Sequence, residues 1–248
     1  MEASQALDGG PIPLTRSKKQ KEKMTESHQQ GHRQRLRERF INAGSEAIAD
    51  YELLEMILFG ANPRKDVKPL AKDLLTKFGN FNNIINAEVK DLMTIPGLGD
   101  TGIALLKAVR AACSKLLKEN IIDKPILSSW ADLFNYCCAS MSHLKIEQFR
   151  LIFLDRKHRV LSEEVQQQGT VDNTPVYPRE VVKRALDLGA SGIILVHNHP
   201  TGDPTPSAAD IDMTKRIKSI CIELGIQLHD HIIIGKGKHT SFKAEGLL

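Results

Sequence analysis

The sequence predicts an α/β domain preceded by a small all-α domain. Up to about residue 117 the apolar residues recur only at helical spacing. A polar stretch that ends in Lys124-Pro125 follows, and beyond it short apolar runs of strand length alternate with amphipathic segments. Strands mixed with helices around one core are typical of an α/β-type domain. The 248 residues of the chain are enough for one large domain or two small ones.

We place the domain boundary in this polar stretch, so that the helical domain covers residues 31–122 and the α/β domain covers residues 125–248. Residues 1–30 are polar, contain Gly9-Gly10 and show no periodicity, so we expect a disordered tail. The whole net charge of +4 lies near this tail, because residues 1–39 carry nine Lys and Arg against five acidic residues. Such a basic arm can contact nucleic-acid phosphates, and it can equally be a solvated tail.

Helical periodicity and stop signals define the elements of the first domain. We expect helices over residues 33–43, 47–59, 67–78, 81–85, 87–93 and 101–117. In the third of these, Leu70, Leu74 and Phe78 share one face. Asp66 is placed to cap its first turn and Gly79 to end its last.

Between the last two helices lies Ile95-Pro96-Gly97-Leu98-Gly99, which resembles the hairpin of a helix-hairpin-helix DNA-binding module. Gly97 and Gly99 would let backbone amides approach a phosphate, and the next helix offers the positive end of its dipole. Contacts of this kind hold a protein on duplex DNA without reading its sequence. The same hairpin can also serve only to pack two helices together, so both interpretations stay open.

In the second domain, strand-like runs alternate with helical ones. We expect strands over residues 149–154, 160–168, 191–196 and 226–234, and helices over residues 128–142, 178–188 and 207–224. Pro178 suits the first position of a helix, and Gly189 suits its end. The third strand is almost entirely apolar and is therefore expected to be buried, and it delivers His197 at its end.

The residues that follow this strand concentrate the chemistry of the chain. In an extended segment, positions i and i+2 point to the same side, so His197 and His199 can present two nitrogens to one metal ion while Asn198 faces away. Ser207 opens a helix, which places Asp210 in the first turn, where its carboxylate can swing back toward the histidines. Three ligands leave a tetrahedral ion one open position, the mark of a catalytic zinc site rather than a structural one.

Each of these elements alone has a simpler explanation. A histidine at a strand end is usually a satisfied surface or core residue. A Ser-x-x-Asp sequence at a helix start is usually only a cap, in which the serine accepts a hydrogen bond from a backbone amide. The order and spacing of the elements together favour the metal site.

The complete pattern resembles the JAMM (MPN-plus) metalloprotease motif, which is His-x-His-Pro followed after six residues by Ser-x-x-Asp. Because the middle residue is Asn198 and the loop is rich in Gly and Pro, the resemblance narrows to the bacterial RadC family. Segments 169–172, 176–180 and 230–233 are also similar to RadC proteins, and the similarity covers about residues 32–248. The letters His-Asn-His do not indicate an HNH nuclease, whose residues are dispersed over a ββα unit.

The resemblance implies a cytidine-deaminase-like fold for the second domain and one zinc ion held by His197, His199 and Asp210. Glu147, at the start of the first strand, matches the position of the family's general base. Ser207 matches a serine whose hydroxyl helps to stabilise the developing oxyanion. Manganese or iron stays open as an alternative to zinc.

Other residues compete for these roles or support them. Glu163, Glu164 and Glu180 are alternatives to Glu147, which can also be a plain exposed acid at a strand start. Asp230 and His231 resemble a family signature, and the pair could orient a ligand from outside the coordination shell or merely lie at a strand edge.

These features predict a zinc-dependent hydrolase of the JAMM metalloprotease type, in which metal-activated water attacks a peptide or isopeptide carbonyl of a protein substrate. The alternative is a DNA-binding protein associated with repair or recombination, whose metal domain is accessory or acts as a nuclease. No apolar run approaches the ~20 residues that span a bilayer, and Glu2 and Asp8 do not suit a secretory signal, so we expect a cytoplasmic protein without a membrane partner. Substrate identity and oligomeric state stay open.

Overall fold

The computed structural model describes residues 18–122, 124–126, 130–169 and 176–248. The chain divides into two compact units, Met1–Leu106 and Lys107–Leu248. Each unit has its own buried core, and each is described by itself below. None of the helices in the described part of the chain combines the length and the apolarity that a membrane span requires.

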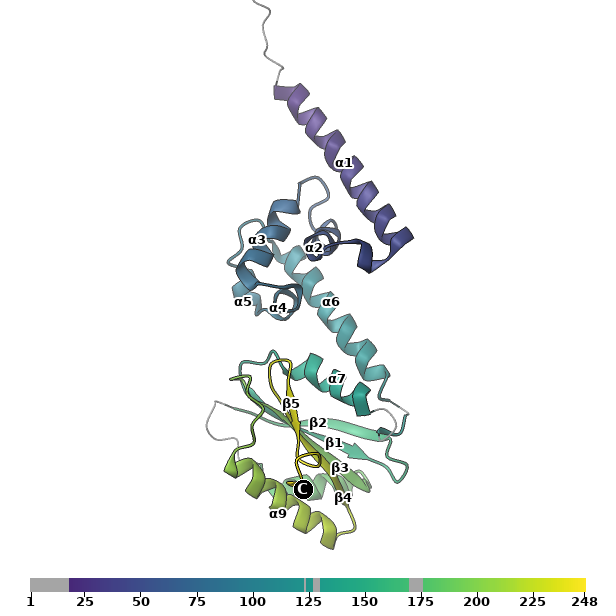
Figure 1. Cartoon of the computed structure of the whole chain (residues 1–248), viewed down its shortest axis with the longest axis vertical. Helices are drawn as coiled ribbons and strands as arrows, with labels where there is room; N and C mark the ends of the chain where they lie inside the picture. The colour runs from purple at the N-terminus through teal and green to yellow at the C-terminus, as the bar shows by residue number, and fades with distance from the viewer. Residues whose placement is uncertain (1–17, 123, 127–129, 170–175) are drawn as a thin grey trace, which may run out of the picture. The chain divides into compact units, whose positions relative to one another are not determined.

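In the first unit, every regular element within residues 18–106 is a helix, as predicted. Its elements are α1 (Lys18–Ala43), η1 (Ser45–Ala47), α2 (Asp50–Leu58), α3 (Lys68–Phe78), α4 (Phe81–Asn86), α5 (Val89–Leu92) and the beginning of α6 (Asp100–Glu119) (Figure 1). Asp66 accepts a hydrogen bond from the amide of Lys68 and Gly79 ends α3 with φ 88°, as the sequence indicated. Fully buried side chains from successive helices form the core, including Leu54, Leu74 and Leu106.

The helix α1 begins earlier than expected. Part of the segment expected to be disordered, from Lys18 to residue 30, is helical, and residues 1–17 lie outside the described residues. The segment lacks an apolar face, the signal on which the expectation of disorder depended. It is nevertheless rich in Lys, Gln and Glu, whose helical propensity is high.

The second unit is built around a mixed five-stranded sheet, so the predicted α/β class is confirmed. Its elements after α6 are α7 (Trp130–Met141), β1 (Glu147–Leu154), β2 (Val160–Gly169), α8 (Pro178–Asp187), β3 (Gly192–Asn198), α9 (Ala208–Glu223), β4 (Gln227–Ile234) and β5 (His239–Ser241). The strand order is β2-β1-β3-β4-β5, in which only β3 and β4 are parallel neighbours. The three-residue β5 was not predicted, because so short a strand has no readable periodicity.

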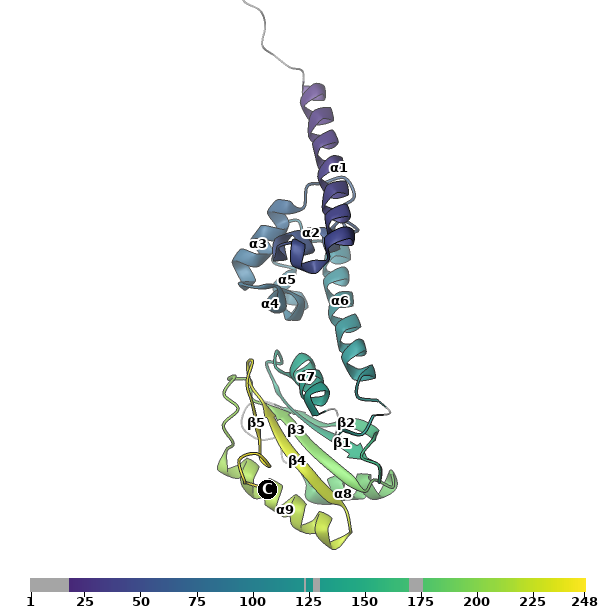
Figure 2. The ribbon, with the colours of Figure 1, turned by 45° about the vertical axis from the view of Figure 1, so that its right-hand side comes forward.

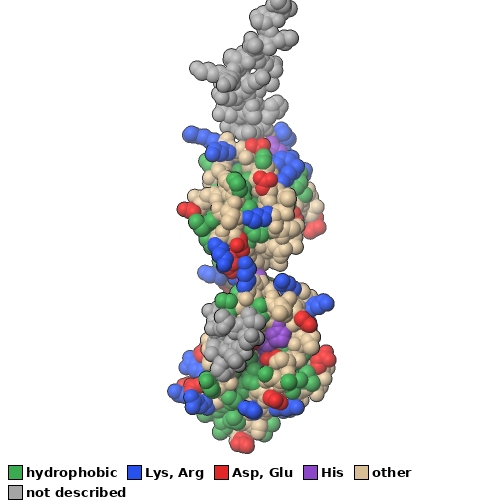
Figure 3. Space-filling model, turned by 90° about the vertical axis from the view of Figure 1, so that its left-hand side faces the viewer, with side chains coloured by type: hydrophobic (Ala, Val, Ile, Leu, Met, Phe, Trp, Pro, Cys, Tyr) green, Lys and Arg blue, Asp and Glu red, His purple; other side chains and the backbone are tan. Residues whose placement is uncertain are grey.

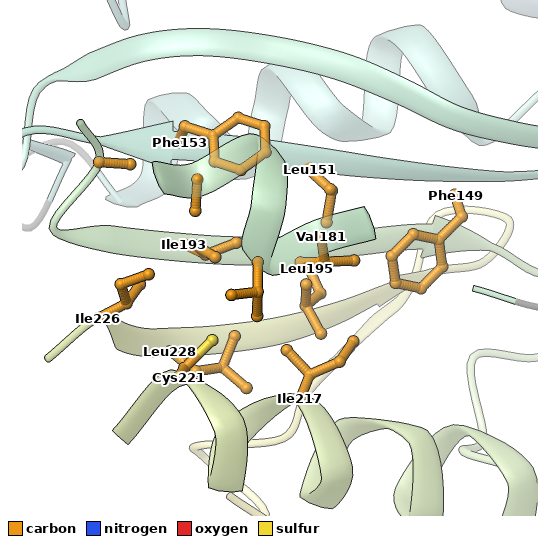
Figure 4. Packing of buried hydrophobic residues seen from close by; sticks show 13 residues of the cluster. Phe149, Leu151, Phe153, Val181, Ile193, Leu195, Ile217, Cys221, Ile226 and Leu228 are labelled. Carbon is orange, nitrogen blue, oxygen red and sulfur yellow. The ribbon is translucent and has the colours of Figure 1, made fainter. Parts of the chain in front are cut away.

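Helices cover both faces of this sheet. Figure 2 shows α7 over one face and α8 and α9 over the other. Toward α8 and α9, apolar side chains of β1, β3 and β4 pack against Val181, Ile217 and Cys221 (Figure 4). Burial on both faces explains why β3 is apolar along nearly its whole length.

The structure divides the chain earlier than the polar stretch at residues 119–125. The division falls between Leu106 and Lys107, inside the continuous helix α6. The end of α6 packs into the second unit, since Leu117, in its last turns, contacts the apolar cluster that includes Ile121, just after the helix, and buried residues of α7. A helix shared between two cores gives no break in periodicity, so the sequence pattern could not reveal this division.

The topology gathers three chain segments at one edge of the sheet. The parallel strands β3 and β4 are joined through α9, which runs back across the sheet, so α9 begins at the edge where β3 ends. β1 is antiparallel to β3, with Phe149 opposite His197, so β1 also begins at this edge. The start of β1, the end of β3 and the first turn of α9 therefore meet.

Candidate metal centre

The three predicted ligands converge at this edge. One donor atom each from His197, His199 and Asp210 lies within 4.8 Å of the others. The two Nε2 atoms of the histidines are 3.0 Å apart, and the Asp210 carboxylate oxygens are 3.4 Å from Nε2 of His197 and 3.6 Å from Nε2 of His199. Two imidazole nitrogens and a carboxylate oxygen form a donor set that suits zinc.

The tautomer of His197 is fixed by a chain of hydrogen bonds through His231 and Thr214. The Thr214 hydroxyl donates to the carbonyl oxygen of Asp210 at 2.5 Å, so it accepts from Nδ1 of His231 at 2.6 Å. A neutral His231 then has a lone pair on Nε2, which accepts from Nδ1 of His197 at 2.8 Å. The remaining nitrogen of His197, Nε2, therefore carries a lone pair that points at the other ligands.

His199 is oriented in the same way by a backbone group. Its Nδ1 lies 2.8 Å from the carbonyl oxygen of Asp203, which can only accept, so Nδ1 is the donor. The Asp203 carboxylate accepts from the amide and hydroxyl of Thr205, as expected for a residue that caps a turn. In a neutral His199 the lone pair on Nε2 thus points toward His197 and Asp210.

The arrangement places two lone pairs and a carboxylate around one point, and this electron-rich space suits a cation. In the chain without metal, a proton on His199 can fill it, because the hydrogen bond to Asp210 raises the pKa of His199. A divalent ion satisfies all three donors at once. The residues present therefore fit the metal that the sequence motif implies.

Electrostatics prepare the other two ligands to bind metal. Burial lowers the pKa of His197 to about 4, so this fully buried ring is neutral at pH 7. Although burial acts to raise the pKa of Asp210, the hydrogen bonds with His199 and from Ser207 hold that pKa well below its ordinary value. A neutral imidazole and an ionised carboxylate are the forms that bind a metal.

Ser207 orients Asp210. Its amide and its hydroxyl donate to Oδ2 of Asp210 at 2.8 and 2.7 Å, and its hydroxyl accepts from the Asp210 amide at 3.1 Å. These bonds form a capping box at the start of α9. Ser207 thus lies beside the predicted ligands, and its hydroxyl is already engaged with one of them. Its proposed contact with an oxyanion stays a prediction.

Aromatic rings pack against the imidazoles of His197 and His231, which are fully buried. The ring of Phe149 stacks on His197 with a centroid distance of 5.8 Å and an interplanar angle of 15°. Phe242 covers His231 at 4.4 Å. A dry environment strengthens the electrostatic interactions of the ligands and of any ion that they hold.

Glu147 lies at the first position of β1, beside the ligands, and its charge interacts with those of His199 and Asp210. Burial raises the pKa of this carboxyl; His199 lowers it and Asp210 raises it further, with a net upward shift. A carboxylate with a raised pKa next to a metal centre is suited to take and return a proton near neutral pH.

The competing glutamates Glu163 and Glu164 are engaged with partners other than the candidate ligands. Glu163 accepts from Arg150, Lys118 and Tyr136. Glu164 is paired with Arg184, which donates through Nε and Nη2.

The structure separates the pair Asp230 and His231. His231 contacts His197 through a hydrogen bond of 2.8 Å between Nε2 and Nδ1. The Asp230 carboxylate instead accepts from the amides of His231 and Lys243 and from the hydroxyl of Ser241. Asp230 therefore fixes the segment after β4, which brings Phe242 over His231.

The glycine hairpin lies in the helical unit, between α5 and α6. Gly97 has φ 85°, a value that favours glycine, and a Cβ added at Gly97 or Gly99 would meet no described atom within 4 Å. Asp100 opens α6 directly after it, which places a negative charge at the helix end proposed to face phosphate. On the face shown in Figure 3, Lys and Arg side chains of this unit are interspersed with Asp and Glu.

Comparison with known proteins agrees with this geometry. A UPF0758 protein of Ruegeria pomeroyi is 52% identical over 222 residues, which cover 90% of this chain and 99% of the relative. A UPF0758 protein of Rhodobacter capsulatus is 55% identical over 213 residues, 86% of this chain and 100% of the relative. The chain belongs to the UPF0758 family.

Two family models match separate parts of the chain. The UPF0758 N-terminal model matches residues 28–104, and the model described as a RadC-like JAB domain matches residues 127–247. The predicted resemblance to RadC proteins is therefore confirmed. The second match contains every predicted ligand as well as Glu147 and Ser207.

Sequence reasoning missed Thr214 in this UPF0758 family member. The residue lies one helical turn after Asp210, where a threonine hydroxyl can reach the carbonyl four residues back. That spacing was a usable signal. The partner on its other side, His231, comes from a distant strand, so the bridge itself could not be predicted from the spacing.

Proposed function

We propose that the chain is a zinc-dependent hydrolase of peptide or isopeptide bonds, with His197, His199 and Asp210 as ligands. The observation that carries the proposal is the pair of hydrogen-bond networks that aim both imidazole Nε2 lone pairs at one carboxylate. An ion bound there supplies a water that is acidic enough to be deprotonated near pH 7.

The chain's own residues would perform the remaining steps. Glu147, whose pKa is raised by burial, accepts the proton of the attacking water and returns it to the nitrogen of the leaving amine. Ser207 keeps Asp210 in place, and its hydroxyl would help to stabilise the negative charge that develops on the oxygen of the reacting carbonyl. The Phe149 and Phe242 rings keep bulk water away from the imidazoles.

The test is cleavage of a degenerate library of peptides and Lys-linked isopeptides, read by mass spectrometry. Zinc-loaded protein should release products, and a chelator should abolish their release. Glu147→Gln should retain zinc and cleave about 100- to 10,000-fold more slowly, the range for loss of a general base. Glu180→Gln, which changes an exposed alternative candidate, is the matched control and should cleave normally.

Two results would count against the proposal. Cleavage at the wild-type rate by Glu147→Gln would remove Glu147 from the base role while leaving the metal centre intact. A wild-type chain that binds no zinc would reject the metal centre itself.

A further inference from the structure

The side chain of Asn198 bridges the backbone on both sides of Glu147. Asn198 is the last residue of β3, lies between the two ligand histidines and is 1% exposed. Its Oδ1 accepts from the amide of Gln148 at 2.9 Å, and its Nδ2 donates to the carbonyl oxygen of Ile146 at 3.2 Å. A longer contact of 3.5 Å joins Nδ2 to the carbonyl oxygen of Leu144.

This bridge extends the hydrogen bonding between β1 and β3 beyond the last pair of backbone partners. The paired residues of β1 and β3 end at Phe149 opposite His197. The carboxamide of Asn198 then offers an acceptor to Gln148 and a donor to Ile146, which precedes β1, as a peptide group of the neighbouring strand would. Glu147 is the residue between the two groups that the carboxamide holds.

The same backbone register sets the direction of the Glu147 side chain. Successive residues of a strand point to opposite faces. Gln148 accepts from Nε of Arg150 at 2.6 Å, and Arg150 reaches Ser140 of α7, so Gln148 faces α7. Glu147 and Phe149 consequently face α9, where Phe149 stacks on His197.

We infer that Asn198 is a positioning residue for Glu147: its carboxamide holds the start of β1 so that the Glu147 carboxylate faces the metal ligands. The inference rests on the proposed function of Glu147 as the base. An asparagine suits this role because one short side chain carries both a donor and an acceptor. Its hydrogen bonds go to Gln148 of β1 and to Ile146 just before the strand rather than to an imidazole, so its loss should spare metal binding.

The first test is hydrogen exchange of the metal-free, full-length chain. Asn198→Ala should accelerate exchange of the Gln148 amide by about tenfold, as expected for loss of one buried hydrogen bond. Ser191→Ala is the matched control, because the Ser191 hydroxyl donates to the Leu154 carbonyl at the opposite end of the same strand pair. If Asn198→Ala does not fold, Asn198→Ser, whose hydroxyl is too short to span both groups, replaces it.

The second test uses Co²⁺ alone as a probe of the site, through its visible absorption spectrum. Glu147→Gln should change the spectrum, because the Glu147 carboxylate interacts electrostatically with His199 and Asp210, which would hold the ion. Asn198→Ala should reproduce that change, and the double variant should match Glu147→Gln alone, since both substitutions remove the same interaction. The Zn²⁺ affinity of Asn198→Ala should stay within about threefold of wild type, far less than the 10- to 100-fold loss typical of residues that support ligands.

The outcomes separate this inference from the proposed function. A wild-type Co²⁺ spectrum for Asn198→Ala beside an altered one for Glu147→Gln overturns the inference and leaves Glu147 as the base. An unaltered spectrum for Glu147→Gln overturns both roles and leaves the metal centre. Unchanged exchange of the Gln148 amide in Asn198→Ala overturns the bridge itself.

Discussion

The candidate metal centre of the α/β unit and the glycine hairpin of the helical unit were both predicted from short sequence patterns, but the structure supports them differently. At the metal centre, His197, His199 and Asp210 are each held by a hydrogen bond to another residue. At the hairpin, Gly97 and Gly99 present backbone and open space. Side chains that are fixed by hydrogen bonds present defined donor and acceptor atoms, which limits the chemistry that a site can perform. An exposed backbone hairpin is compatible both with helix packing and with phosphate binding.

The largest expected effect tests the metal centre directly. Asp210→Ala removes one of three ligands and the only acid among them, so we expect zinc affinity to fall by more than about 1,000-fold, beyond the losses caused by supporting residues. Competition with a chromophoric chelator measures this affinity. Asp212→Ala, an exposed neighbour on α9, should bind zinc normally. Equal affinities in the two variants would contradict the centre.

A smaller effect tests whether the hydrogen-bond network matters beyond the ligands. Thr214→Val removes the acceptor of His231 Nδ1, so the tautomer of His197 is no longer fixed and zinc affinity should fall about 10- to 100-fold. Thr76→Val is the matched control, because the Thr76 hydroxyl also bonds the carbonyl four residues back, at 2.9 Å, in α3. If both variants bind zinc like wild type, the network does not tune the site.

A smaller effect of acid on the α/β unit is expected from the buried residue His229. Burial lowers the pKa of His229, in β4, to about 4, with His158 and Lys243 acting in the same direction. The His229 imidazole is therefore protonated at a lower pH in the folded form than in the unfolded form, where its pKa is about 6.5. Above pH 6.5 this residue is neutral in both forms and does not lower the free energy of unfolding. As the pH falls toward 4, protonation of the unfolded form lowers that free energy by up to about 3 kcal/mol.

Fluorescence of the single tryptophan, Trp130 in α7, reports unfolding of the α/β unit in the metal-free chain. The denaturant concentration at the midpoint of unfolding should decrease as the pH is lowered from 6.5 to 4.5, and the decrease should be smaller in His229→Gln. Identical pH profiles for the two proteins would show that His229 titrates normally in the fold.

The smallest effect concerns the hairpin. With Asp100 at the start of α6, we expect weak duplex-DNA binding that declines steeply with salt. Gly99→Glu should lower it by less than about tenfold, measured by fluorescence anisotropy at low salt. Gly44→Glu, at a positive-φ position with open space in the same unit, controls for added charge and strain. If the DNA affinity changes neither with salt concentration nor in Gly99→Glu, the hairpin serves only to pack the two helices together.

Much of the fold could be predicted from local pattern. The apolar stripe of α3 and the run that forms β3 predicted those elements within a residue or two, because burial imposes its period on the sequence. The start of α1 could not be predicted, because its polar residues have helical propensity without periodicity. The division inside α6 was hidden for a different reason: a continuous helix can belong to two cores.

At the site, the sequence alone indicated the three candidate ligands, since His197, His199 and Asp210 lie close together in the chain and their spacing sets their direction. Only the tertiary structure decided which atoms they present and what holds Glu147 beside them. Thr214 with His231, and Asn198 with Gln148, are pairs 17 and 50 residues apart. Contacts between distant residues depend on how the strands and helices pack, and local spacing carries no record of that packing.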